Sequence, residues 1–207
     1  MEKKLAWARP RMMQCQGDGD DCWASVIECA LALFKPQTIP LSQIVQKFKA
    51  DGGRFGAHGI KDFSEALKSF NILKAGAKSP DGFKQLRQVF CTIMRSIDQG
   101  LPVIVGWKLT WDADDGTIMS AKHAGIIFGY DTASLQGRVF VMEPIKIERD
   151  EWYNKYTTEP WTMSKAFESF GNMKGMITEF YLTKRPHEPA SNGVFNPNLM
   201  NYESLDA

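Results

Sequence analysis

The first half of the chain contains apolar residues at helical spacing, beginning at Trp23. Its apolar positions recur at intervals of three and four residues and are Trp23, Val26, Ile27, Ala30, Leu31 and Phe34. Asp20 and Asp21 precede this stripe and Pro36 follows it, so aspartate caps and a proline stop bound the predicted helix. We expect this helix to occupy a central position in the fold.

Three further stripes with the same spacing follow it. Their apolar residues are Leu41, Ile44, Val45 and Phe48; then Ile60, Phe63, Ala66, Leu67 and Phe70; then Phe83, Leu86, Phe90, Ile93, Met94 and Ile97. Asp51-Gly52-Gly53 ends the first of the three, and Gly100 closes the last. The pattern therefore predicts a helical first half.

Beyond Gly100 the pattern changes to short runs of β-branched and aromatic residues, bounded by glycine or turn residues, as is typical of strands. These runs cover 103–107, 124–130, 139–142 and 176–182. The segment 131–137 predicts a hairpin, and 111–116 predicts a polar loop. The second half is therefore expected to form an antiparallel sheet.

This order of elements predicts an α+β fold with the first helix packed across the sheet and a cleft between the two parts. We expect one domain over 1–183, with its helical part at about 14–100 and its sheet part at about 101–183. Residues 184–207 are rich in proline and asparagine, which predicts a poorly structured tail.

The charge balance and the hydropathy narrow the classes of partner. Of 207 residues, 25 are Lys or Arg and 24 are Asp or Glu, so the net charge of +1 lacks the excess that nucleic-acid binding uses. The longest apolar run, 23–34, is broken by Ser25 and Glu28, so no membrane span is expected. The N-terminus reaches Pro10 before any apolar run, which predicts cytoplasmic synthesis, with export independent of a signal peptide as the alternative.

The four cysteines, Cys15, Cys22, Cys29 and Cys91, are too few for a disulfide scaffold and are expected to be thiols. Their spacing matches no common zinc pattern, so no metal and no cofactor are expected. The acidic loop at 111–116 lacks the spacing of an EF-hand and is interpreted as a solvated turn.

Cys22 stands in a setting that suits a nucleophile. The glycine-containing segment 16–21 brings it to the first turn of the predicted helix, where unpaired N–H groups and the helix dipole favour a thiolate. Asp20 and Asp21 would oppose the thiolate if they pointed inward, and we expect them to cap the helix and face solvent. The alternative is an ordinary buried thiol, since free cysteine packs as a small hydrophobic residue.

A thiolate that attacks a carbonyl needs donors for the resulting oxyanion. Gln16 offers a side-chain amide, with Gln14 as its substitute, and the backbone N–H of Cys22 offers a second donor.

A base is also required, and the sequence holds three histidines. His123 begins a predicted strand, whereas His58 lies in a predicted turn and His187 in the tail, so His123 is the expected base. Glu143 ends the next strand and is expected to orient the imidazole through its other nitrogen, with Asp131 as a substitute.

Three segments together resemble the papain-like cysteine peptidases. They read Gln16-x5-Cys22-Trp23-Ala24, then His123-Ala124-Gly125 with Gly129-Tyr130-Asp131 after an apolar strand, then Val139-x-Val141-x-Glu143-Pro144. The similarity spans about residues 14–181 and is nearest to the compact bacterial branch: the double-glycine peptidases that process bacteriocins and the secreted effectors of plant pathogens. Departures are Gly19-Asp20-Asp21 before the cysteine and a glutamate where the family has aspartate or asparagine.

The resemblance implies a papain-like fold and a cysteine hydrolase, a peptidase or amidase acting on a peptide or protein substrate. Carried over by position, it implies Gln16 as oxyanion donor, Cys22 as nucleophile, His123 as base and acid, and Glu143 as third group. The alternatives are an inactive papain-like interaction module, or the same triad used for deamidation or acyl transfer. Substrate contacts are expected from Trp23, Trp107 and Trp111, with core packing as the alternative interpretation.

Overall fold

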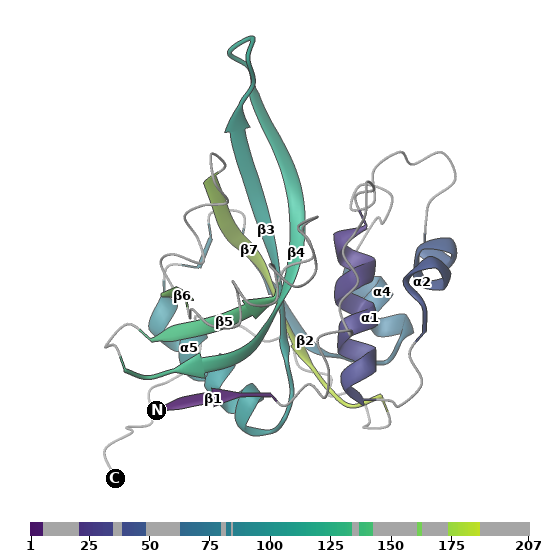
Figure 1. Cartoon of the computed structure of the whole chain (residues 1–207), viewed down its shortest axis with the longest axis vertical. Coiled ribbons are helices and arrows are strands. Elements are labelled where there is room, and N and C mark those ends of the chain that lie inside the picture. The colour runs from purple at the N-terminus through teal and green to yellow at the C-terminus, as the bar shows by residue number, and fades with distance from the viewer. Residues whose placement is uncertain are drawn as a thin grey trace.

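The computed structural model describes residues 1–5, 21–34, 39–48, 63–79, 82–83, 85–133, 137–142, 161–162 and 174–186. Within these ranges the chain forms helices and an antiparallel sheet, an α+β arrangement as predicted (Figure 1).

The four expected helices are present. They are α1 (Cys22–Phe34), α2 (Leu41–Phe48), α4 (Phe63–Ser69) and α5 (Leu86–Asp98). Helix α5 ends as the sequence predicts, because Gly100 adopts a positive φ of 76° that favours glycine. The stripe for α5 was expected to begin at Phe83, but the helix starts at Leu86, and Phe83 packs against Phe180 instead.

The described residues contain a seven-stranded sheet whose strand pairs are all antiparallel. Its strands are β1 (Glu2–Lys4), β2 (Leu73–Lys78), β3 (Val103–Asp112), β4 (Ile118–Asp131), β5 (Arg138–Met142), β6 (Trp161–Thr162) and β7 (Lys174–Thr183). The strand order is β2-β7-β3-β4-β5-β6, and β1 pairs with β4. The predicted hairpin at 131–137 is confirmed, since Asp131 pairs with Arg138.

The expected division into a helical half and a sheet half was wrong, because strands β1 and β2 both lie in the first half. Strand β2 lies between α4 and α5 and pairs with β7 at the far end of the chain. Its sequence, Leu-Lys-Ala-Gly-Ala-Lys, holds no β-branched or aromatic residue, so propensity gave no signal. A Cβ at Gly76 would come within 2.7 Å of the Tyr181 ring, which explains why a small residue stands there.

The loop expected at 111–116 is shorter than predicted. Strand β3 continues through Trp111 and Asp112, which pair with Met119 and Ile118 of β4. The turn itself is closed by a hydrogen bond from the Ala113 N–H to the Thr117 carbonyl, 2.8 Å long. Because the segment is polar, its sequence did not predict that Trp111 and Asp112 pair as part of a strand.

Two apolar clusters lie against the sheet, and neighbouring residues of one strand alternate between them. Ile104, Ile126 and Tyr181 belong to the cluster that contains α1, whereas Val105 and Ile127 belong to the cluster that contains α5. In Figure 1, α1, α2 and α4 lie together on one side of the sheet. The sheet therefore carries helices on both faces.

Candidate active site

Cys22 is the first residue of α1. The Asp21 carbonyl accepts the first hydrogen bonds of the helix, from the N–H groups of Ala24 and Ser25, each 3.0 Å long. The N–H groups of Cys22 and Trp23 therefore lie ahead of the first helical hydrogen bond, at the positive end of the helix dipole. Cys22 itself is only 2% exposed.

Helix α1 is buried from Cys22 to Ala32. Cys29, two turns after Cys22, is completely buried, and burial together with the neighbouring Glu28 charge raises the pKa of its thiol. Cys22, Cys29 and the half-buried Cys91 of α5 are all free thiols, as predicted; Cys15 lies outside the described residues. One helix thus carries two buried thiols in different settings, one at its positive end and one in its interior.

Helix α1 packs against β4, the strand that carries the predicted base. Cys22 and Ala124, the residue after His123, belong to the same apolar cluster. Figure 1 shows α1 running alongside β4. The structure therefore brings the two elements that hold the predicted nucleophile and base next to each other.

His123 is buried, with 6% of its surface exposed, and its ring packs against Trp107. The two residues face each other in the β3–β4 register, their ring centroids are 6.0 Å apart and their planes meet at 33°. Because directly opposed residues share one face of a sheet, the His123 side chain leaves β4 on the face of Trp107, which belongs to the α5 cluster. In the described pairing β5 joins β4 only from Ile126 onward, so β3 is the described neighbour of β4 at His123.

The remaining predicted members of the triad and oxyanion hole are not all described. Gln14, Gln16 and Glu143 lie outside the described residues, and their roles stay predictions. Asp131, the substitute for Glu143, is eight residues beyond His123, about 25 Å along an extended strand. It accepts hydrogen bonds from the Ala133 N–H, at 2.9 Å, and from Arg138, and it is therefore engaged elsewhere.

The three tryptophans named as substrate contacts occupy different surroundings. Trp23 is 2% exposed and packs edge-on against Phe48 of α2, with centroids 6.4 Å apart. Trp107 is 1% exposed beside His123. Trp111 pairs with Met119 through its backbone, and its side chain lies outside the described set. Trp23 and Trp107 thus serve as core residues, whatever further contacts they make.

A carboxylate near this region was missed at the sequence level. Glu179 of β7 accepts a hydrogen bond from the Tyr181 hydroxyl at 2.9 Å, and its Oε1 lies 3.6 Å from the ammonium of Lys122, the residue before His123. Its side chain is 14% exposed. A charged residue within the strand predicted at 176–182 was the available signal.

Compared with protein-family models and with curated protein sequences, the chain matches none. None of the described helices has the length and apolarity that crossing a bilayer requires.

Proposed function

We propose that this protein is a papain-like cysteine hydrolase that uses Cys22 as nucleophile and His123 as base. One observation carries the proposal: a thiol at the first position of a buried helix that packs beside the strand holding a buried histidine. The helix start supplies N–H donors, and the strand supplies an imidazole.

In the proposed reaction the Cys22 sulfur, having given its proton to His123, attacks the carbonyl carbon of an amide substrate. The Cys22 N–H and the Gln16 amide donate to the oxyanion. His123 then protonates the leaving amine, which departs and leaves a thioester on Cys22. Water, deprotonated by His123, attacks the thioester, and the acid product leaves as the thiol is restored.

One geometric requirement follows from the register. The His123 side chain leaves β4 on the face of Trp107, whereas Cys22 belongs to the cluster on the other face. To reach the sulfur, the imidazole must therefore pass around the edge of β4 at His123, where the described part of β5 does not pair with β4. That requirement makes the dyad directly testable.

The test compares the three described cysteines. Burial alone predicts that the half-buried Cys91 reacts with an electrophile faster than Cys22, which is 2% exposed, or Cys29, which is fully buried. The proposed activation reverses the order for a peptidyl epoxide, so mass spectrometry should find the adduct on Cys22. We expect His123→Gln to slow this labelling by roughly a hundredfold or more, and Cys29→Ala, on the same helix, to leave it unchanged.

A second function is favoured by the Trp107–His123 packing, which places the imidazole with the α5 cluster rather than the α1 cluster. It is a papain-like fold that acts as an interaction module without catalysis. Labelling of Cys91 ahead of Cys22, with no effect of His123→Gln, would exclude the hydrolase and favour this second function.

A further inference from the structure

The end of the β3–β4 hairpin extends beyond the rest of the sheet. Strand β7 pairs with β3 only as far as Thr110, opposite Lys174. Past that point the described strands β3 and β4 pair only with each other, ending at Asp112 and Ile118. We call residues 111–119 the tip hairpin; Figure 1 shows it projecting away from the other described elements.

Exposed apolar side chains gather on this tip hairpin. Ile118 is 76% exposed and Met119 is 46% exposed. Apart from Met1, they are the large hydrophobic side chains that the described part of the chain leaves exposed. As consecutive strand residues they leave opposite faces of the hairpin, so a partner that buries both side chains must enclose the end of the hairpin.

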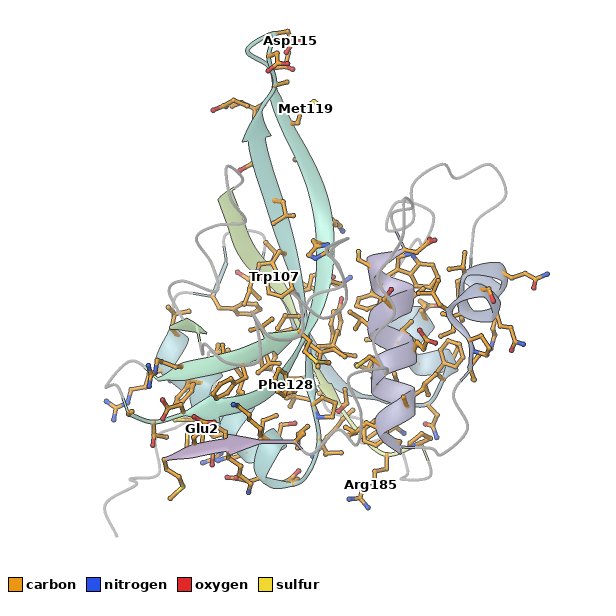
Figure 2. All side chains as sticks on the ribbon, viewed as in Figure 1. Glu2, Trp107, Asp115, Met119, Phe128 and Arg185 are labelled. Atoms are coloured by element: carbon orange, nitrogen blue, oxygen red, sulfur yellow. The ribbon has the colours of Figure 1, made fainter. Side chains whose placement is uncertain are left out.

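The same tip hairpin is acidic. Asp112, Asp114 and Asp115 are exposed, and no Lys or Arg lies between Lys108 and Lys122 in the sequence. Asp115 accepts hydrogen bonds from the Thr117 N–H at 2.9 Å and its hydroxyl at 2.6 Å, so it also holds the turn. Figure 2 shows Asp115 at the end of the hairpin and Met119 below it.

We propose that the tip hairpin docks a polypeptide partner that presents lysine or arginine side chains around apolar residues. The three carboxylates select the charge of the partner, and Ile118 and Met119 supply the apolar contact that it covers. Two copies of this chain meeting tip to tip would bring like charges together, which opposes self-association through this surface. The proposal is independent of the chemistry at Cys22.

The test uses the full chain and two short fluorescent peptides. Both carry two leucines in a serine-glycine background, and they differ only in whether lysines or glutamates flank the leucines. Fluorescence anisotropy should show binding of the lysine peptide, weakening as salt rises, and no binding of the glutamate peptide.

Two variants of the tip hairpin separate the apolar contribution to peptide binding from the contribution of charge. The variant I118S/M119S should weaken binding by about tenfold or more. The variant D112N/D114N, which keeps Asp115 for the turn, should weaken it by roughly three- to tenfold and flatten its dependence on salt. Glu65→Gln, an exposed charge change on α4, is the matched control and should change nothing. Thermal unfolding of each variant checks that the fold is intact.

Three outcomes would overturn the proposal. They are equal binding of the two peptides, binding that neither tip variant alters, and concentration-dependent dimers in sedimentation that I118S/M119S abolishes. The last result would assign the tip hairpin to a second copy of the chain.

Discussion

The ring of Trp107 lies over the α-carbon of Gly125 on the neighbouring strand. A Cβ added at Gly125 would stand 2.7 Å from Cζ3 and 2.8 Å from Cη2 of that ring, and 2.9 Å from the Met142 carbonyl oxygen. Since the same indole also packs against the His123 ring, with centroids 6.0 Å apart, the missing side chain at Gly125 leaves room for Trp107 beside the imidazole. This glycine therefore helps to position the candidate base.

Gly125→Ala should destabilise the protein by roughly 1–3 kcal/mol, because the methyl group overpacks the core. Gly116→Ala is the matched control: that site has a positive φ of 80° and nothing within 4 Å, so its cost of about 1 kcal/mol is a backbone effect only. Urea unfolding measures both. Trp107→Phe should reduce the cost of Gly125→Ala and leave that of Gly116→Ala unchanged; equal costs in both backgrounds would show that the ring does not constrain Gly125.

Ser25→Ala should stabilise the protein by up to about 1 kcal/mol. The Ser25 hydroxyl is fully buried in α1 and has no hydrogen-bond partner among the described contacts, so its removal deletes an unsatisfied polar group. Ser96→Ala is the comparison, since the Ser96 hydroxyl of α5 donates to the Leu101 carbonyl at 3.1 Å, and its loss should cost about 1 kcal/mol. In thermal unfolding the two substitutions should shift the melting temperature in opposite directions. Destabilisation by Ser25→Ala would mean that the Ser25 hydroxyl has a hydrogen-bond partner.

Cys29 should resist iodoacetamide in the native protein, even in mildly alkaline buffer. Burial, reinforced by the Glu28 charge, raises the pKa of its thiol, so almost no thiolate is present. Unfolding in urea should make Cys29 as reactive as the other cysteines, which peptide mapping detects. Native labelling of Cys29 as fast as that of Cys91 would show that α1 opens without global unfolding.

The stability of the protein should depend on the ionisation of the Asp98 carboxyl. The hydrogen bond from the Lys3 ammonium, 2.7 Å long, lowers the pKa of the Asp98 carboxyl below its ordinary value of 3.8, against burial and with help from the Tyr130 hydroxyl. A lowered folded-state pKa means that the stabilisation is present above the ordinary value and is lost as pH falls through the folded value. Asp98→Asn should therefore lower the melting temperature at neutral pH.

The comparison is made at two pH values. Near pH 6 the wild type should melt above Asp98→Asn, and the difference should shrink at a pH well below the ordinary value of 3.8, where the wild-type carboxyl takes up its proton. A difference that is the same at both pH values would show that the ionised carboxylate does not hold β1 to α5.

The helices could be predicted because their signals are local. The stripe from Trp23 to Phe34 and the proline behind it define α1 within one residue. Strands β1 and β2 could not be predicted in this way, since Glu2–Lys4 and Leu73–Lys78 form strands only through partners more than fifty residues distant. Their pairing comes from tertiary context, which overrides weak propensity.

For the candidate site, the sequence predicts the residue types but not the face of the sheet from which each side chain projects. Cys22 at the helix start and His123 on a strand followed from pattern. The face from which His123 leaves the sheet depends on its register with Trp107, and a shift of one residue would reverse it. Strand register of this kind is set by side-chain packing across the whole sheet and cannot be read from one strand.

The burial of α1 from Cys22 to Ala32 has a consequence for how the molecule opens. A buried, hydrogen-bonded segment has no partial route to solvent, so the amide hydrogens of α1 from Ala24 onward should exchange with deuterium only in molecules that unfold completely. The slowest-exchanging amides of the protein should therefore lie in this helix, and their exchange rate reports the global free energy of unfolding.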